Sequence, residues 1–319
     1  MTELYEGIVI RLTAGSCLVQ TDVRLVQCSL RGNLKKEFTF AANAAGPRRV
    51  LRTKLQAYVD TVTVGDRVRF RDTHRDAGVI EEVLPRRSRF VRRGFRGREQ
   101  TIVCNLELVM VVFAATEPHL DPWKLDRFLV AAEGEGLDAV IVANKVDLTD
   151  GAIPEAYEEF VRAGYRVIGS SARCAVGIEG IREALRGRVS AVVGPSGVGK
   201  SSLLNAVHPG LNLRTSDVGL VTHKGRHTTT AAQLIPLESG GWVADTPGLR
   251  QMFLLPRPVD EIAGSFPEFA PYLGRCEYSN CRHLAEIDCA IKLAAQSGAI
   301  SPRRYEGYRI LYTENADQK

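Results

Sequence analysis

The chain has 319 residues, of which 45% are hydrophobic and 25% are charged, values typical of a soluble globular protein of two or three domains. Its longest apolar run, Leu108 to Ala115, is far shorter than the roughly 20 residues of a membrane-spanning helix, which excludes a transmembrane protein. The net charge of only +5 does not by itself indicate a nucleic-acid partner. The start, MTELYEGIVIRL, lacks the pattern of a signal peptide, so we expect a cytoplasmic protein with no membrane partner.

Residues 4 to 86 alternate between apolar and polar positions with the period of two that predicts β-strands. Short strands separated by turn residues predict a small barrel, and we favour an OB-type β-barrel over an SH3-like barrel. The alternation weakens from Asn33 to Tyr58, where lysine and arginine accumulate. This stretch is expected to be a basic loop, either solvated or in contact with RNA.

A stretch rich in arginine follows, from Pro85 to Arg98, with seven arginines interrupted by Phe90 and Phe95. Arginine interleaved with aromatic side chains is the composition that binds a phosphate backbone and stacks on bases. A plain basic linker between two domains is an equal alternative. We place the first domain boundary here, so that residues 1–87 form the barrel domain.

Strand and helix patterns alternate over the next part of the chain. Buried strands are expected at 106–115, 137–143, 165–169 and 189–193, and helices at 122–133, 155–163 and 178–185. The continuous apolar character of these runs is typical of parallel strands covered on both faces. Residues 88–260 are therefore predicted to form an α/β domain with a mostly parallel sheet.

The sequence GPSGVGKSS lies between an apolar strand and a helix and matches the pattern of a P-loop. Its glycines let the backbone wrap closely around phosphate oxygens at the positive end of the following helix. Lys200 would reach the outer phosphates, and Ser201 would hold Mg²⁺. The residues expected to bind the nucleotide here are Gly194, Pro195, Ser196, Gly197, Val198, Gly199, Lys200, Ser201 and Ser202.

Two further motifs follow apolar strands. In NKVD, the carboxylate of Asp147 can accept from both N1–H and the 2-amino group of guanine, a donor pair that adenine lacks. Asn144 would brace the loop and the base, and the stem of Lys145 would cover one face of the ring. Ser171 and Ala172, which begin the tripeptide SAR, could offer a backbone N–H to guanine O6.

The motif DTPG is expected to contact the metal and the γ-phosphate. Asp245 is predicted to be a second-sphere ligand of Mg²⁺, and the N–H of Gly248 to bind the γ-phosphate. Between the P-loop and this motif, residues 224–230 (KGRHTTT) are expected to form a switch loop that supplies a threonine to Mg²⁺. Three threonines compete for this role, and we favour Thr229 before Thr228.

Hydrolysis needs a positioned water, and many GTPases orient it with a glutamine directly after DxxG. Leu249 occupies that position in this chain, and an apolar side chain cannot orient water. His227 is the candidate replacement, with Lys200 and Thr229 as the other expected catalytic residues. This predicts slow intrinsic turnover that a partner accelerates, whereas His227 as a plain polar loop residue is the alternative.

The order of the motifs is unusual, because NKVD and SAR precede the P-loop instead of following it. The same sheet can form from a chain that is cut and rejoined elsewhere, since circular permutation is tolerated. DTPG then leads directly into the C-terminal part. Loss of the γ-phosphate is therefore expected to move that part.

The C-terminal part, residues 261–319, contains a cluster of potential metal ligands. Three of the seven cysteines and one histidine lie within fourteen residues, at Cys276, Cys281, His283 and Cys289. This spacing predicts a closed, structural zinc site in an α-rich domain with little core of its own, and scattered buried cysteines are the alternative. The tail has helical spacing, with Arg303 and Arg304 expected on its exposed face.

The motif order NKVD, SAR, GPSGVGKS, GRHTTT and DTPG, followed by C-x4-C-x-H-x5-C, resembles the RsgA (YjeQ) family of circularly permuted GTPases. The resemblance covers nearly the whole chain, including VGDRVRF in the barrel. It implies OB-fold, permuted GTPase and zinc-binding domains, and a late step of small ribosomal subunit assembly. It also implies that His227 takes part in hydrolysis, and that hydrolysis releases the factor from the subunit. The stretch CNLE at 104–107 departs from the Asn-Val-Asp wording usual in the family.

We therefore expect a GTPase that hydrolyses GTP to GDP and phosphate and uses Mg²⁺ and one structural Zn²⁺. It is expected to dock as a monomer on the small ribosomal subunit and its rRNA through the barrel, the arginine stretch and the zinc domain. Two alternatives are an RNA-associated zinc protein that holds GTP only as a structural ligand, and a P-loop ATPase or kinase. The motif NKVD argues against the second alternative.

Overall fold

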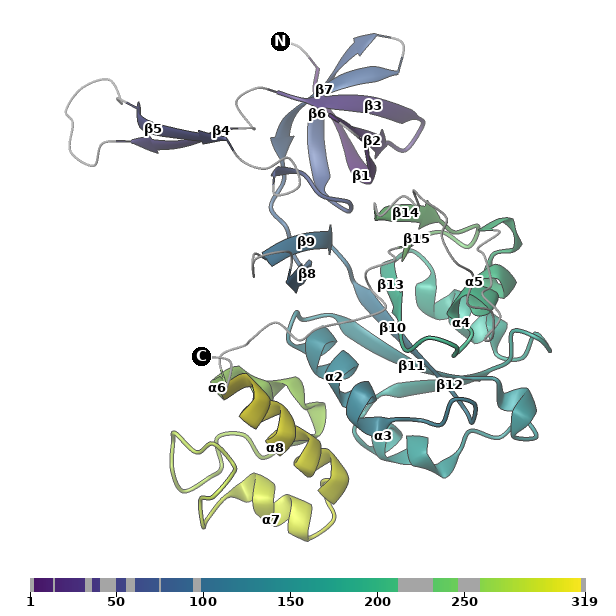
Figure 1. Cartoon of the computed structure of the whole chain (residues 1–319), viewed down its shortest axis with the longest axis vertical. Coiled ribbons are helices and arrows are strands. Elements are labelled where there is room, and N and C mark those ends of the chain that lie inside the picture. Colours follow the sequence, from purple (N-terminus) through teal and green to yellow (C-terminus); the bar gives the residue numbers. More distant parts are fainter. Residues whose placement is uncertain are drawn as a thin grey trace, which may run out of the picture. The chain divides into compact units, whose positions relative to one another are not determined.

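A computed structural model describes residues 3–13, 15–31, 36–40, 50–55, 61–74, 76–93, 99–211, 232–245 and 259–316. The chain divides into two compact units, which are described separately (Figure 1). The first contains the described residues up to Leu106 together with 232–235 and 244–245. The second contains 107–211, 236–243 and 259–316.

A closed barrel of five strands forms most of the first unit. Its strands are β1 (Tyr5–Thr13), β2 (Ser16–Gln20), β3 (Leu25–Leu30), β6 (Arg67–His74) and β7 (Ala77–Val83). They follow the order β1-β2-β3-β7-β6, and β6 pairs with β1 to close the barrel. Strands β3 and β7 run parallel, while the other neighbours are antiparallel. The OB-type barrel predicted from the sequence is confirmed.

Two strand pairs lie outside the barrel order. They are β4 (Lys36–Phe40) with β5 (Val50–Leu55), and β8 (Arg89–Arg93) with β9 (Glu99–Cys104). The prediction of a loop over 33–58 is therefore wrong for β4 and β5. Part of the arginine-rich stretch forms strand β8, and its role as a linker or as an RNA contact stays a prediction. The Phe, Thr and Val residues of these segments favour strands, and pairing satisfies their backbone polar groups. A further strand, β14 (Gln233–Pro236), pairs with β1 at Arg11.

A buried carboxylate joins the barrel to the arginine-rich stretch. The Asp66 side chain is fully buried and accepts from Nε and Nη2 of Arg86, at 2.7 and 2.8 Å, and from the N–H of Thr63 at 2.7 Å. The Cys104 thiol donates to the same carboxylate at 3.0 Å, and burial together with the nearby negative charge raises its pKa. Arg86 therefore stabilises the fold and is not available to a phosphate.

The second unit is built on a parallel sheet. Its strands are β12 (Arg166–Ser170), β11 (Asp138–Asn144), β10 (Leu108–Ala114), β13 (Val189–Val193) and the first two residues of β15 (Trp242–Asp245), in that spatial order. Pairing of β10 with β11 and β13, and of β11 with β12, is parallel throughout. Every residue of β10 is buried, as expected for a central strand covered on both faces.

Helices cover both faces of this sheet. The covering helices are α2 (Pro122–Glu133), α3 (Glu158–Arg162), α4 (Ile178–Leu185) and α5 (Lys200–Val207). The helices α6 (Val259–Ile262), α7 (Ala290–Gln296) and α8 (Pro302–Ala316) follow in the C-terminal part. Met110 and Val112 of β10 share a core with residues of α4 and α5. Phe113 points to the opposite face, where its ring meets Phe128 of α2 at 6.1 Å.

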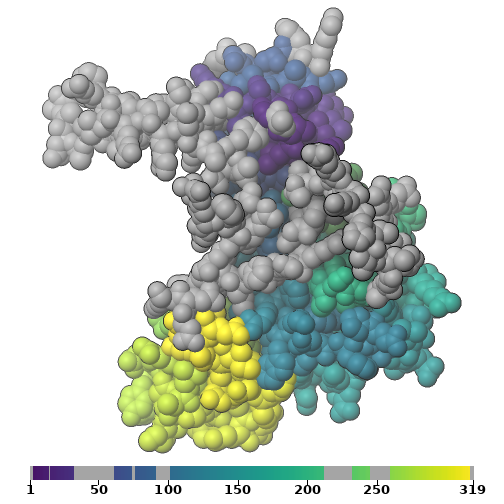
Figure 2. All heavy atoms as spheres, in the orientation of Figure 1, coloured from purple at the N-terminus to yellow at the C-terminus, as the bar shows by residue number. Residues whose placement is uncertain are grey.

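The C-terminal residues pack directly against the sheet-bearing part of the second unit. Phe266, Phe269 and Tyr308 form an aromatic cluster with ring centroids 4.9 to 5.7 Å apart. Val130 of α2 belongs to the same core. Figure 2 shows the C-terminal residues, in yellow, in contact with the neighbouring teal residues of this unit. No helix in the described part of the chain has the length and apolar character needed to cross a membrane.

The ion pair between Arg86 and Asp66 can be tested by substitution. Arg86→Met should lower the free energy of unfolding of the barrel by about 3 kcal/mol, because it leaves a buried carboxylate without its charged partner. The control is Arg87→Met, which removes an exposed neighbouring side chain. Urea unfolding monitored by barrel-specific amide signals would measure both changes, and equal effects of the two substitutions would contradict the prediction.

Candidate functional site

The predicted nucleotide motifs lie where the parallel strands end. NKVD begins at the last residue of β11, the SAR tripeptide follows β12, and the P-loop follows β13. Because parallel strands all finish at the same edge of the sheet, these motifs meet there, where ligands bind in open α/β folds.

The P-loop has the backbone conformation that its glycines predict. Gly194, Gly197 and Gly199 have φ angles of 139°, 83° and 90°. Residues other than glycine rarely adopt this backbone conformation. A Cβ at Gly194 would lie 2.1 Å from the carbonyl oxygen of Val112. Val198 is fully buried and anchors the loop to the core, so the loop is held tightly against the sheet.

Lys200 is the first residue of α5, and Ser201 is the second. The ammonium of Lys200 donates to the carbonyl oxygens of Gly194, at 2.7 Å, and of Pro195. The Lys200 side chain therefore points back over the P-loop, toward the carbonyl groups at the start of the loop. A phosphate placed in this loop would meet a positive charge as well as the first N–H groups of a helix.

Asn144 connects the guanine motif to the P-loop. Its side-chain amide donates to the carbonyl oxygen of Val198 at 2.8 Å, and its Oδ1 accepts from the Ser170 hydroxyl at 3.1 Å. Both side chains are buried, and a Cβ at Gly199 would lie 2.5 Å from Asn144 Nδ2. Ser170 is not among the residues predicted from the sequence, although it lies at the end of a strand and just before SAR.

The remaining residues of the base motif present suitable groups. Lys145 has a φ of 66° and donates from Nζ to the carbonyl oxygen of Glu117. Asp147 lies in the short helix Val146–Leu148, and its carboxylate has no hydrogen-bond partner among the described residues. In SAR, the N–H of Ser171 already donates to Val176 at 3.0 Å, so of the two predicted donors Ala172 is the one whose N–H suits a ligand.

The expected switch residues lie outside the described residues. These are His227, the threonines Thr228, Thr229 and Thr230, and Gly248. Asp245 is described only as the last residue of β15. Their predicted roles therefore stay predictions.

Cys276, Cys281, His283 and Cys289 come together in one cluster. Their potential ligand atoms all lie within 4.8 Å of one another. The Sγ atoms of Cys276 and Cys289 are 3.8 Å apart, and each lies 3.4 Å from His283 Nδ1. A tetrahedron with Zn–S of about 2.3 Å and Zn–N of about 2.0 Å has edges of about 3.8 and 3.5 Å. The donor set and its spacing fit Zn²⁺.

The surroundings of this cluster favour a bound cation. Burial lowers the pKa of His283, which keeps the imidazole in the neutral form that binds metals. Burial and the neighbouring cysteines raise the pKa of Cys281 to about 12, so the thiolate form needs a compensating positive charge. Tyr305 and Tyr308 of α8 donate to the carbonyl oxygens of His283 and Arg282, at 2.8 and 2.6 Å. These tyrosines are not predicted from the sequence, because they lie far from the ligands in the chain.

Carboxylates neutralise much of the positive charge on the barrel wall. Arg69 on β6 pairs with Glu6 at 2.9 Å and with Glu82 at 3.2 Å, and Arg71 pairs with Glu81 at 3.4 Å. The outer surface of the barrel at β6 is therefore not a continuous cationic surface. Within the described part of the chain, exposed arginines without an ion pair include Arg11, Arg87 and Arg89.

The arrangement defines a class of protein, a P-loop GTP-hydrolysing enzyme whose chain is circularly permuted. Residues 83–255 match the family model described as RsgA GTPase. The chain belongs to the RsgA GTPase family, and the resemblance seen in the sequence is confirmed. GTP is accordingly the substrate of this class of enzyme, with Mg²⁺ as its usual companion ion.

Relatives match over nearly the whole chain. "Small ribosomal subunit biogenesis GTPase RsgA" of Gemmatimonas aurantiaca is 42% identical over 320 residues, which is 98% of each chain. The protein of the same name from Moorella thermoacetica is 40% identical over 313 residues, 97% of each chain. The crystal structure of YjeQ from Thermotoga maritima matches with a TM-score of 0.75 and 32% identity, covering 98% of this chain and 99% of that one. YloQ, a circularly permuted GTPase, matches with a TM-score of 0.74 and 28% identity, over 99% and 96%.

The hydrogen bond between Ser170 and Asn144 gives a testable prediction. Ser170→Ala should lower the free energy of unfolding by about 1 kcal/mol, because Asn144 Oδ1 loses its buried donor. Ser190 on β13 is the matched control, since its buried hydroxyl has no hydrogen-bond partner among the described residues. Ser190→Ala should leave stability unchanged or raise it. Denaturant unfolding compares the two variants, and the opposite ranking would refute the prediction.

The cysteine cluster predicts metal content. The purified chain should contain about one zinc ion, and Cys281→Ser should lose it and unfold at a lower temperature in the C-terminal part. Cys174→Ser alters an exposed cysteine outside the cluster and should retain the metal. Elemental analysis with calorimetry measures both properties, and full zinc content in Cys281→Ser would exclude this ligand set.

Proposed function

We propose that this chain hydrolyses GTP to GDP and phosphate during late maturation of the small ribosomal subunit. Contact with that subunit stimulates hydrolysis, and hydrolysis releases the chain from the subunit. The observation that carries the nucleotide assignment is the buried connection from Ser170 through Asn144 to Val198, which joins the base motif to the phosphate loop. The ribosomal assignment is supported by the names of the relatives, which are small ribosomal subunit biogenesis GTPases.

The phosphates and Mg²⁺ would be held by the P-loop and the two switch segments. The N–H groups of Gly194 and of residues 196–202 would surround the phosphates, and Lys200 would neutralise the β and γ groups. Ser201 and Thr229 bind Mg²⁺ directly, and Asp245 does so through water. The N–H of Gly248 binds the γ-phosphate.

Guanine would be recognised by NKVD and SAR. Asp147 accepts from N1–H and the 2-amino group, and the N–H of Ala172 donates to O6. The stem of Lys145, whose ammonium donates to the carbonyl oxygen of Glu117, covers one face of the base. Adenine would leave the Asp147 carboxylate without donors, which disfavours ATP.

Hydrolysis in this proposal is mainly a matter of positioning and electrostatic stabilisation. Lys200 stabilises the charge that develops on the transferred phosphoryl group. Mg²⁺ held by Ser201 and Thr229 would supply further positive charge to the phosphates. His227 orients the attacking water in place of a glutamine. Since Leu249 cannot perform that task, intrinsic turnover is slow, and the ribosomal partner accelerates it. We expect the chain to act as a monomer in the cytoplasm, where the subunits are assembled.

The domain limits 1–87, 88–260 and 261–319 remain part of the proposal, and so does rRNA contact. Exposed arginines such as Arg87 and Arg89 suit phosphate contact better than those on the β6 wall, which already have carboxylate partners. The zinc site would hold its loops in shape for docking. Because four protein ligands leave no open coordination position, catalysis by zinc is not expected.

Phosphate release from GTP, with and without small ribosomal subunits at fixed salt concentration, tests the proposal. Small subunits should accelerate turnover by at least about 10-fold, within the range that partner-supplied groups reach in other GTPases, and large subunits should not. His227→Ala should keep GTP binding and lose the acceleration. GTP binding without multiple turnover would instead support a structural role for the nucleotide, and equal use of ATP would indicate an ATPase or kinase.

A further inference from the structure

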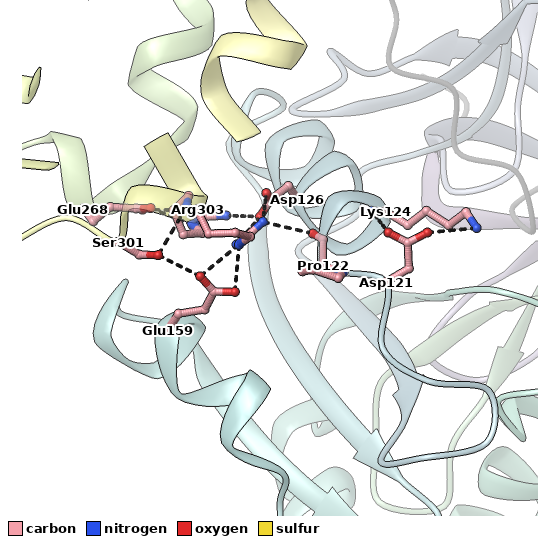
Figure 3. A network of polar contacts seen from close by, with 9 residues as sticks. Asp121, Pro122, Lys124, Asp126, Glu159, Glu268, Ser301 and Arg303 are labelled. Carbon is pink, nitrogen blue, oxygen red and sulfur yellow. Dashed lines mark hydrogen bonds and ion pairs between the residues drawn. The ribbon is translucent and has the colours of Figure 1, made fainter. Parts of the chain in front are cut away.

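A cluster of buried charges fastens helix α8 to helices α2 and α3 (Figure 3). We call Arg303, Arg304, Asp126, Glu159 and Glu268 the α8 clasp. Arg304 and Asp126 are almost fully buried, with exposed fractions of 0% and 1%. The expectation that both arginines lie on an exposed face is therefore wrong, because each finds carboxylate partners far away in the chain.

Arg304 makes the most deeply buried contacts of the clasp. Its Nη1 donates to Asp126 Oδ1 at 2.5 Å, and its Nε and Nη2 donate to Glu268 at 2.6 and 2.9 Å. The guanidinium carbon lies 4.7 Å from the ring centre of Phe266. A buried charge is tolerated only with such complete pairing, so the clasp holds its members in one arrangement.

Arg303 joins α2 to α3. It donates to Asp126 and, at 3.4 Å, to the carbonyl oxygen of Pro122, the first residue of α2. Its Nε lies 2.8 Å from Glu159 on α3. Figure 3 shows Arg303 between the carboxylates of Asp126 and Glu159, which come from different helices. One side chain of α8 thus contacts both α2 and α3 directly.

Arg303 also contacts aromatic rings of both α2 and α3. Its guanidinium carbon lies 5.3 Å from the ring centre of Trp123 on α2 and 5.1 Å from that of Phe160 on α3. Close packing of α8 on α2 depends on Gly307, where a Cβ would lie 2.4 Å from Asp126 Oδ2. Side-chain stacking and helix packing therefore support the same geometry as the ion pairs.

Helices α2 and α3 adjoin the two loops that shape the guanine motif. The loop before α2 is bonded to NKVD by the N–H of Ala115, which donates to Asn144 O at 2.6 Å, and by Lys145 Nζ, which donates to Glu117 O. The segment before α3 is fixed by the Tyr157 hydroxyl, which donates to the carbonyl oxygen of Ala114 at 2.9 Å. A shift of α2 would be transmitted to NKVD directly through the first two bonds, and a shift of α3 indirectly through Ala114, which lies beside Asn144 in the sheet.

We propose that Arg303 is a positioning residue for guanine recognition. By holding α2 and α3 at a fixed separation, it keeps the NKVD loop, and with it Asp147, in the arrangement that accepts both donors of guanine. The inference rests on the proposed role of Asp147 and assigns a task in base recognition to a residue of the C-terminal part. The zinc-bearing part then contributes to nucleotide specificity as well as to docking.

The test compares the affinities of the full chain for GDP and IDP. Inosine keeps N1–H but lacks the 2-amino group, so the GDP to IDP preference reports how well Asp147 is placed. Arg303→Gln should weaken GDP binding by about 10-fold, the effect of losing one well-placed hydrogen bond to a charged group. The ratio of the GDP affinity to the IDP affinity should fall toward a value of one. Glu159→Gln, a milder change, should act in the same direction.

The matched control is Arg127→Gln. Arg127 and Glu314 also pair across α2 and α8, but their side chains are 37% and 39% exposed, so this variant should leave the preference unchanged. Isothermal titration supplies the affinities, and zinc content with circular dichroism establishes that each variant is folded. If Arg303→Gln fails to fold, Glu159→Gln decides the question.

The possible outcomes separate this inference from the proposed function. A folded Arg303→Gln chain with reduced thermal stability but the original GDP to IDP preference would show that the clasp is only structural, and would overturn the inference alone. An original chain that binds GDP and IDP equally well would overturn the proposed role of Asp147, and this inference with it. A reduced preference in both clasp variants, but not in Arg127→Gln, would support it.

Discussion

The common direction of the strands in the central sheet is the constraint on which the nucleotide site depends. Strands β10, β11 and β12 are hydrogen-bonded in register up to their last residues, so that Ala114 lies beside Asn144, and Asn144 beside Ser170. Any segment that follows one of these strands must therefore emerge at the same edge. The order in which the chain visits the strands does not matter. A permuted chain consequently assembles its base and phosphate motifs at one place.

Close backbone approach sets a second condition on the same edge. The P-loop lies so near the sheet that side chains cannot be accommodated at Gly194 or Gly199, which face Val112 and Asn144 respectively. The position of the loop is thus dictated by strands from elsewhere in the chain, and not by the loop alone. This explains why a polar side chain on β11 can support a loop that follows β13.

The sequence predicts features that depend on local pattern and misses those that depend on distant partners. Helix α2 begins at Pro122 and ends at Glu133 as expected, because capping and apolar spacing lie within the segment itself. The strand pair β4 and β5 was mistaken for a loop, since its many basic residues obscured the alternation.

The candidate sites show the same division. The P-loop and the four potential zinc ligands each lie within a short stretch of the chain, so both can be recognised in the sequence. Arg304 was expected to be exposed, because a charged residue in a helix usually faces water, and Asp126 is 178 residues away. Only the folded chain brings these two charges together.

Burial of the α8 clasp also limits how this protein can be divided for experiments. A fragment that stops before α8 would leave Asp126 and Glu159 without their guanidinium partners and would expose Val130 to water. Such a fragment would combine an unpaired interior charge with an uncovered apolar surface, two features that promote aggregation. Low activity of a truncated chain would then report a damaged core and could not be attributed to a missing docking surface. Point substitutions in the intact chain are the appropriate means of separating the roles of its parts.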